Sequence, residues 1–388
     1  MRAVVYRGVS DLRLETVPVP RISPHELLVR VAVCGVCPTD IKKIHYGTVP
    51  PPRIFGHETA GTIVRIGGRT SSLVTRHSSL RLGDRVALHH HVPCLDCHYC
   101  RHHAFAQCAT YKRTGITAGF EPAGGGYAEY VRVMPFVLPG VVKIPAKNSF
   151  AEGAMLEPVN TVLKAVKRLD LLRGDRVLVA GQGPIGLMFT KILQLAGMKV
   201  LATDLLPSRL KLARKFGAKW TGLVAGSKLK VAGSKLENFQ PSTFNLQLPL
   251  DAAVIAVPSD AAVAQALQLV RGAGKVLLFA HTKRAGVGDQ KSEVGKKAPT
   301  LHSSHITHHP SPFTLDLASI CLDEKDLIGS YSSDFTLQRE VARLVFSRRL
   351  DVRSLITHRF PLAETAAAVA LAARPTEASL KIVVDVAG

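Results

Sequence analysis

The sequence has few acidic residues, few aromatic residues and no long uninterrupted run of apolar side chains. Its 388 residues include 29 Asp and Glu, and only 6% are Phe, Trp or Tyr. The most apolar window, residues 252–270, is interrupted by Pro258, Ser259 and Asp260 and does not suit a membrane span. The first fifteen residues contain no apolar core of the kind found in a signal peptide. We therefore expect a cytoplasmic protein without a membrane partner.

The shortage of acids leaves 50 Lys and Arg largely uncompensated, and the formal net charge is +21. Such a charge favours anionic partners, among them the phosphates of a cofactor. The basic residues are scattered along the chain and are not interleaved with aromatic side chains, which argues against a dedicated nucleic-acid site. No specific nucleic-acid partner is therefore expected.

Four of the seven cysteines gather in one short stretch, PCLDCHYCRHHAFAQC. The spacing of Cys94, Cys97, Cys100 and Cys108 allows four thiolates to saturate a tetrahedral zinc ion and leave no open position. The spacing also resembles iron–sulfur ligation, but no proline follows the fourth cysteine and no second cluster motif is present. An odd, clustered set of cysteines fits metal binding in a reducing compartment better than a disulfide framework. A structural zinc site is the prediction.

Residues 176–204 carry the clearest pattern in the chain. An apolar strand at 176–180 is followed by G-x-G-x-x-G, by a run that suits a helix at 187–197, and by a second strand at 199–203 that ends at an acid. This order is typical of the βαβ unit that binds dinucleotides, with the pyrophosphate at the helix N-terminus. An acid at that point accepts hydrogen bonds from the adenosine ribose and repels a 2′-phosphate, so NAD is favoured over NADP. The predicted cofactor-binding residues are Gly181, Gly183, Pro184, Ile185, Gly186, Asp204 and Arg209.

A second group of possible metal ligands is spread over the first 160 residues. Cys37 and His57 are good zinc ligands, but at twenty residues apart they can meet only through tertiary folding. With the carboxylate of Glu157 they would hold a zinc ion and leave one position open for a substrate, as a catalytic site requires. Taken singly, each is more simply interpreted as a buried core residue.

The periodicity divides the chain into an all-β part and an alternating part. Short strands and turns up to about residue 150 predict a barrel-type domain, with strands at 1–6, 26–34, 61–66, 85–89 and 127–133. From Glu157 to about Ser332, strands alternate with helices and predict a doubly wound parallel sheet. Residues 226–247 and 281–312 fit neither pattern; a connection as long as the second is either a surface excursion or a functional lid.

Taken together and in order, these motifs make the chain similar to the zinc-dependent medium-chain dehydrogenase/reductase family, which includes alcohol, sorbitol and threonine dehydrogenases. The resemblance covers nearly the whole length and rests on residues 37–40, 56–58, 94–108, 124–130, 157–158, 181–204 and 355–360. It implies an α/β protein with a discontinuous GroES-like β-barrel catalytic domain at 1–157 and 333–388, which contains a zinc lobe at about 92–110. The Rossmann coenzyme domain would be 158–332. Two zinc ions per chain, one catalytic and one structural, and NAD(H) are the implied cofactors.

By the same resemblance, Cys37 and His57 are ligands of the catalytic zinc. Glu157 occupies the position of the third protein ligand, a role that Glu58 can take in polyol-dehydrogenase-like members, and the sequence leaves this choice open. Asp40 matches the carboxylate that orients the ligand histidine.

The proton path shows one departure from the family pattern. Thr39 matches the hydroxyl that contacts the substrate oxygen and passes its proton on. Five residues after Cys37, where alcohol and sorbitol dehydrogenases commonly have a histidine, this chain has Lys42. A lysine does not shuttle protons near neutral pH unless its pKa is strongly depressed. Water, the cofactor ribose or His45 could complete the path.

The implied function is reversible hydride transfer from an alcohol to NAD, giving a ketone or aldehyde. A secondary alcohol of a polyol, cyclitol or amino alcohol is the favoured substrate class. The alternatives are a family member that binds NAD with little turnover and, less favoured, a basic zinc-containing nucleic-acid-binding protein. A homodimer or homotetramer is expected by analogy with the family. The expected catalytic residues are Thr39, Cys37, His57, Glu157 and Asp40.

Overall fold

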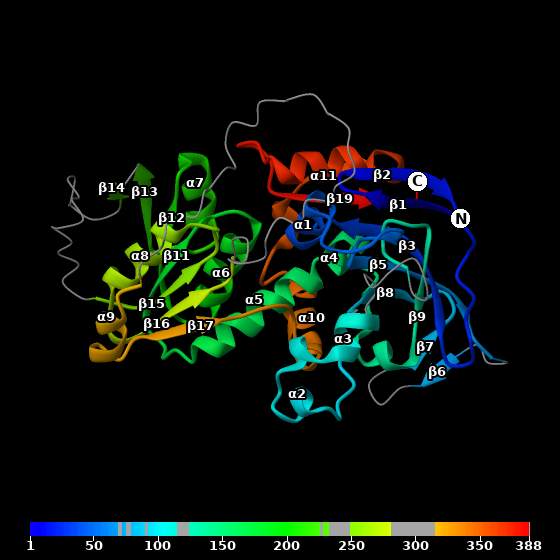
Figure 1. The fold of residues 1–388 in the computed structure, drawn as a ribbon, viewed down its shortest axis with the longest axis horizontal. Coiled ribbons are helices and arrows are strands. Elements are labelled where there is room, and N and C mark those ends of the chain that lie inside the picture. The colour runs from blue at the N-terminus through cyan, green and yellow to red at the C-terminus, as the bar shows by residue number, and fades with distance from the viewer. Residues whose placement is uncertain are drawn as a thin grey trace, which may run out of the picture.

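Two seven-stranded sheets dominate the computed structural model, which describes residues 1–68, 72–74, 79–89, 92–114, 124–225, 228–232, 249–280 and 315–387. In Figure 1 the sheet of the coenzyme half lies on the left and the barrel half on the right. The expected α/β architecture with a barrel-type part and a doubly wound part is confirmed.

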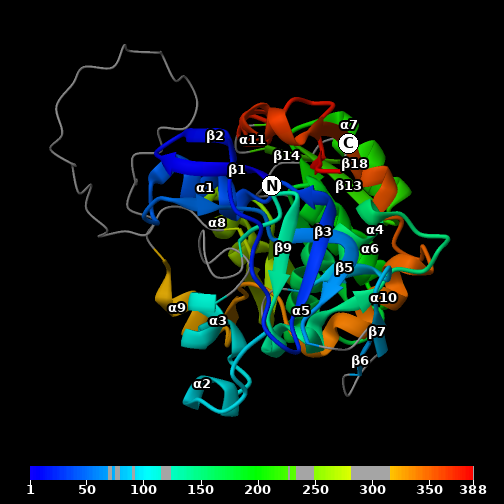
Figure 2. The ribbon, with the colours of Figure 1, turned by 90° about the vertical axis from the view of Figure 1, so that its right-hand side faces the viewer.

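The barrel sheet combines strands from both ends of the chain. Its order is β10-β8-β5-β3-β19-β18, with β9 paired to β3, and Figure 2 shows β3, β5 and β9 beside one another. Val384 of β19 pairs with Cys34 of β3, so the C-terminal residues complete a sheet begun near the N-terminus. The strands are β3 (Leu27–Gly35), β5 (Glu58–Ile66), β8 (Arg85–Leu88), β9 (Tyr130–Val133), β10 (Val142–Lys143), β18 (Ile356–Pro361) and β19 (Lys381–Asp385). Smaller sheets contain β1 (Arg2–Gly8), β2 (Asp11–Thr16) and β4 (Arg53–Ile54), and β6 (Ser72–Val74) with β7 (Ser79–Arg81).

The second sheet has the order β14-β13-β12-β11-β15-β16-β17. All its neighbours are parallel except β14, which runs antiparallel to β13. The central strand β11 is buried after its first residue, as expected where helices cover both faces. The strands are β11 (Arg176–Ala180), β12 (Lys199–Asp204), β13 (Trp220–Ala225), β14 (Lys228–Ala232), β15 (Leu250–Ile255), β16 (Val270–Leu278) and β17 (Asp326–Gly329).

Helix α5 (Leu156–Leu169) joins the two halves and runs between them in Figure 1. One hydrophobic cluster extends from Val33 and Ala60 of the barrel sheet through α5 to Val177 and Val179 of β11. The helix therefore shares its core with both sheets. The other helices are α1 (Pro38–Tyr46), α2 (His98–Arg101), α3 (Ala109–Thr114), α4 (Phe150–Ala154), α6 (Pro184–Leu195), α7 (Pro207–Lys215), α8 (Asp260–Leu269), α9 (Leu317–Leu322), α10 (Gln338–Phe346) and α11 (Thr365–Ala373).

Several features differ from the sequence-based expectation. None of the helices α1 to α5 was predicted, and the edge strand β14 adds an antiparallel neighbour to an otherwise parallel sheet. Within 226–247, residues 228–232 form β14, while the remainder of that segment and the whole of 281–312 lie outside the described residues. None of the helices in the described ranges has the length and apolarity that crossing a membrane requires.

Candidate functional site

The start of helix α1 presents the first three site residues. Cys37 is the N-cap residue, with extended backbone, and Pro38 supplies the fixed φ that suits the first helical position. Thr39 and Asp40 therefore lie in the first turn, two and three residues after Cys37. Asp40 is completely buried although it is charged, which requires a partner inside the protein.

That partner is His57. Its Nδ1 lies 3.1 Å from Asp40 Oδ1, and the N–H of Gly56 donates to Asp40 Oδ2 at 3.2 Å. Burial alone would lower the pKa of His57, but the charges of Asp40 and Cys37 outweigh it and raise this pKa well above its ordinary value. The surroundings of His57 thus favour positive charge at this point, which fits a metal cation, and Nε2 is the nitrogen that would bind it.

Glu58 follows His57 at the start of β5 and is also buried. Its carboxylate binds the ammonium of Lys381 on β19, with Nζ 2.6 Å from Oε1 and 2.5 Å from Oε2. Lys381 also donates to the carbonyl of Val36, next to Cys37, at 2.9 Å. A Cβ on Gly35 would lie 1.8 Å from Glu58 Oε2, so only glycine leaves room for this carboxylate. Sequence reasoning did not identify Lys381, because nothing local marks a strand lysine as buried.

Three of the four predicted ligands form one donor group. The sulfur of Cys37, a ring nitrogen of His57 and a carboxylate oxygen of Glu58 all lie within 4.8 Å of one another. Glu157 does not belong to this group of three, but it is buried in the first turn of α5 nearby. Burial raises the pKa of Glu157 to about 7, although the charge of His57 acts in the opposite direction. A thiolate, an imidazole and a carboxylate suit zinc.

The residues considered for the proton path, and one further residue, differ in their burial and in their contacts. Thr39 and Lys42 are half-buried on α1, and burial lowers the pKa of Lys42 while the charge of Cys37 raises it. His45 is exposed, and its Nδ1 is paired with the hydroxyl of Ser10 at 3.0 Å. Tyr331, which follows β17, was not predicted. It is 50% exposed. Partial burial raises the pKa of its phenol, and the charges of His57, Cys37 and Glu157 also act on it.

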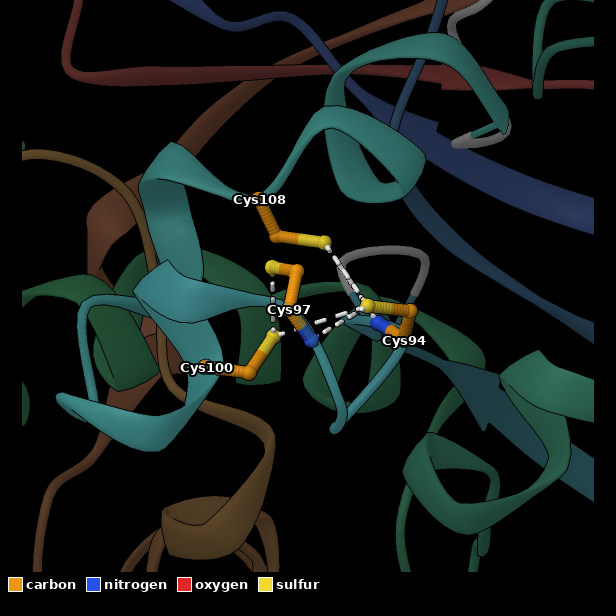
Figure 3. A group of neighbouring side chains, drawn as sticks. All are labelled: Cys94, Cys97, Cys100 and Cys108. Carbon is orange, nitrogen blue, oxygen red and sulfur yellow. Dashed lines mark hydrogen bonds between the residues drawn. The ribbon is translucent and has the colours of Figure 1, made fainter.

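The four-cysteine lobe, residues 94–108, brings its sulfurs together as predicted (Figure 3). Sulfur–sulfur distances are 3.5 Å for Cys97–Cys100, 3.7 Å for Cys108–Cys94 and 3.8 Å for Cys94–Cys100. A tetrahedral zinc with bonds of about 2.3 Å holds its sulfurs about 3.8 Å apart. Backbone N–H groups of Asp96 and Cys97 lower the pKa of Cys94 to about 6, which favours the thiolate that a metal needs. The arrangement fits a closed zinc site.

The glycine turn after β11 has the geometry of a phosphate cradle. Gly181 has a φ of +91°, which glycine adopts without strain, and a Cβ on Gly186 would lie 1.7 Å from the carbonyl oxygen of Gly181. Gly183 is the N-cap of α6, and a Cβ there would meet no protein atom within 4 Å. Open space beside the free N–H groups of a helix N-terminus, where Pro184 and Ile185 start the helix, suits a pyrophosphate.

The two residues predicted for the adenosine end make contacts within the protein. Asp204 accepts the N–H of Gln182 at 2.6 Å and that of Leu206 at 2.9 Å. Each carboxylate oxygen has two lone pairs, so acceptor capacity remains for ribose hydroxyls. Arg209 is buried, and its Nη2 donates to the carbonyls of Thr376 and Ser379 in the loop before β19. Arg209 therefore ties the coenzyme half to the barrel half.

Comparisons with known proteins agree with this geometry. The family model for the alcohol dehydrogenase GroES-like domain matches residues 23–146, and that for zinc-binding dehydrogenase matches residues 184–346. A sorbitol dehydrogenase of Bombyx mori is 29% identical over 394 residues, covering 99% of this chain and 98% of that protein. A structure from Sinorhizobium meliloti, described as a zinc-binding dehydrogenase bound to NADP, is 25% identical with a TM-score of 0.76. Alcohol dehydrogenase TADH from Thermus sp. ATN1 is 26% identical with a TM-score of 0.73, and both structural matches cover 99% of each chain.

A GroES-like barrel joined to a nucleotide-binding sheet, with a thiolate–imidazole–carboxylate donor group, defines a metal-dependent oxidoreductase. The chain belongs to the zinc-dependent medium-chain dehydrogenase/reductase family. Its cofactors are accordingly zinc and a nicotinamide dinucleotide.

Proposed function

We propose that this protein catalyses the reversible, NAD-dependent oxidation of a secondary alcohol in a polyol, cyclitol or amino alcohol. The observation that carries the proposal is the donor group of Cys37, His57 and Glu58, with His57 held by the buried Asp40. The similarity to a sorbitol dehydrogenase over 99% of the chain supports the polyol among these classes.

Each residue has a task that follows from its position. Zinc held by Cys37, His57 and a glutamate would lower the pKa of a substrate hydroxyl. Asp40 fixes the ring of His57 so that Nε2 faces the donor group. Thr39, half-buried in the same helical turn, contacts the substrate hydroxyl and takes its proton outward.

For the third ligand we propose Glu58, with Glu157 in an outer position. Glu58 belongs to the compact donor group, whereas the burial of Glu157 favours its protonated form up to a pH of about 7. A protonated carboxyl beside the site can donate a hydrogen bond to a substrate or water oxygen. Metal analysis of Glu58→Gln and Glu157→Gln would test this: catalytic zinc should be lost only from the first variant.

NAD is the proposed cofactor form because Asp204 ends β12, the position at which an acid binds the adenosine ribose in this fold. A 2′-phosphate would be repelled by that charge. Calorimetric titration with NAD and NADP should show the preference, and Asp204→Ser should reduce it. Equal affinity of the unmodified protein for both would contradict this part of the proposal.

We propose the domain boundaries given by the sequence: 1–157 with 333–388 for catalysis, and 158–332 for coenzyme binding. The pairing of β19 with β3 supports the discontinuous barrel.

We further propose a homodimer or homotetramer, since the edge strand β17 is largely exposed and lies near exposed Leu317 and Leu322 of α9. Light scattering after size exclusion would measure the assembly. A cytoplasmic location is in keeping with seven free cysteines.

A panel of polyols, cyclitols and amino alcohols with NAD, followed by absorbance of the reduced nicotinamide, tests the function. Cys37→Ala should abolish turnover and leave NAD affinity unchanged. NAD binding without turnover on any alcohol would favour the non-catalytic alternative. Salt-sensitive DNA binding without protection by NAD against thermal unfolding would favour a nucleic-acid-binding protein.

A further inference from the structure

The chain returns from the coenzyme sheet to the barrel through four residues, Tyr331–Asp334, which we call the return segment. It lies between β17 and the short 3-10 helix Phe335–Leu337. Its first residue is Tyr331, the residue whose carbonyl and side chain leave the coenzyme sheet just after β17. How this segment is held therefore determines where the ring of Tyr331 lies.

Helix α5 holds both ends of the return segment. The side chain of Asn160 accepts the N–H of Asp334 at 2.8 Å and donates to the carbonyl of Asp334 at 2.9 Å. The ammonium of Lys164, one turn further along, donates to the carbonyl of Tyr331 at 2.9 Å. Asn160 is completely buried, so its bonds to Asp334 form away from water, where an unmade bond is costly.

The middle of the return segment is held from the other side. The hydroxyl of Tyr111, on α3, is hydrogen-bonded to that of Ser332, and the hydroxyl of Ser333 lies 3.4 Å from Nε2 of His89. Ser332 has a φ of +60°, a left-handed conformation that costs a non-glycine residue of the order of 1 kcal/mol. Residues in such conformations persist where the surroundings over-determine them. The return segment is thus held at both ends by α5 and in the middle by Tyr111 of α3 and by His89.

The four-cysteine lobe supports Tyr111, which follows the lobe on α3. Tyr111 is buried in one small core with Phe105, Cys100 and Cys108, and Phe335 packs against that core. The rings of Phe105 and Phe335 meet edge to face at 5.4 Å. The sulfurs that hold the lobe together are therefore in direct packing contact with the groups that hold the return segment. Loss of the lobe would release Tyr111 and Phe335 together.

We propose that the four-cysteine lobe braces the return segment, that Tyr111, Asn160 and Lys164 are positioning residues for Tyr331, and that Tyr331 so held contributes to binding the alcohol. The inference rests on the proposed function only where it has Tyr331 contact the bound alcohol. The lobe then does more than stabilise itself: its metal contributes to substrate affinity through Tyr111.

Tyr111→Phe is the decisive variant, because it keeps the ring in the lobe core and removes only the hydroxyl. Hydrogen–deuterium exchange of the peptide covering 331–334 should become faster by about tenfold, the effect of losing one buried hydrogen bond. KM for the best alcohol should rise several-fold while kcat changes by less than about twofold, because ground-state positioning is affected. Tyr99→Phe, an exposed tyrosine of the same lobe, is the matched control and should change neither quantity.

A Tyr331→Ala background separates positioning from general stability. If Tyr111 acts through Tyr331, adding Tyr111→Phe to Tyr331→Ala should raise KM no further. Lys164→Met should also speed exchange of the peptide 331–334 and raise KM. Lys164→Arg should restore both quantities, because arginine retains a donor for the carbonyl of Tyr331. Unchanged exchange in Tyr111→Phe, or a KM effect that persists without Tyr331, would overturn the proposal. Should no alcohol be turned over, the exchange measurement still decides whether the lobe braces the segment.

Discussion

Replacement of Lys381 by methionine tests the buried ion pair beside the donor group. The side chains of Lys381 and Glu58 are 7% and 1% exposed, so water screens their attraction poorly. Methionine keeps the apolar stem and removes the ammonium. Glu58 then loses its buried counter-ion, and the carbonyl of Val36 loses its donor. Removing one partner of a buried pair typically costs about 3–5 kcal/mol.

The metal state of the protein should change this cost. In metal-free protein, Lys381→Met should lower the free energy of unfolding of the barrel domain by about 3 kcal/mol, measured by urea titration with circular dichroism. Zinc would supply the missing positive charge to Glu58, so the loss should be smaller in zinc-loaded protein. Adding Glu58→Gln to Lys381→Met should recover part of the stability, since no uncompensated charge is left.

The control is Arg359→Met on the neighbouring strand β18. The Arg359–Asp385 pair has side chains 50% and 33% exposed, and exposed pairs contribute about 1 kcal/mol or less. If Lys381→Met shifts the urea midpoint no more than Arg359→Met does, the ion pair carries no special energy and the reasoning from burial is wrong.

Three further predictions concern the cofactor turn, the lobe and acid stability. Gly186→Ala should lower both thermal stability and NAD affinity, because its Cβ would lie 1.7 Å from the carbonyl oxygen of Gly181. Gly183→Ala should lower only NAD affinity, because its Cβ would meet no protein atom within 4 Å. Calorimetry of both variants separates the two effects. Metal analysis should find two zinc ions per unmodified chain and one in Cys97→Ser, and a full complement in the variant would exclude the four-sulfur site. Burial opposes ionisation of Glu152, but bonds from Ser149, Asn148 and Arg348 lower its pKa below the ordinary 4.5. Glu152→Gln should therefore cost about 1–2 kcal/mol at pH 7, and the difference from the unmodified protein should shrink as the pH falls through the lowered pKa of the folded state. A difference that is constant from pH 7 to pH 3 would contradict this assignment.

The parts of the fold that the sequence predicted well are those whose contacts are local. The strand, glycine turn, helix and acid of 176–204 lie within one βαβ unit, and the four cysteines lie within fifteen residues. In both cases the spacing along the chain nearly determines the spacing in space. The helix α6 begins three residues earlier than predicted, because Pro184 occupies its first turn.

The partners of the metal donors could not be predicted in the same way. Lys381 binds Glu58 across 323 residues, and Tyr331 follows the last strand of the coenzyme sheet, far along the chain from Cys37 and His57. A lysine in an apolar strand carries no local mark of burial. Arg209 was predicted from its distance to Asp204, but the structure shows its guanidinium bound to carbonyls of the barrel half. Local patterns specify an element, whereas these contacts depend on how two domains meet.

Helix α5 nevertheless carried a signal that a closer reading of the sequence could use. Glu157, Asn160 and Lys164 are spaced i, i+3 and i+7, so they share one face of a helix whose other positions are mostly apolar. Polar residues in a stripe along a buried helix require partners, because unpaired polar groups there are costly. Here the first lies beside the metal donors and the other two hold the return segment. These three polar positions therefore connect the metal site to the return segment between the domains. Substitutions there should weaken substrate affinity more than NAD affinity.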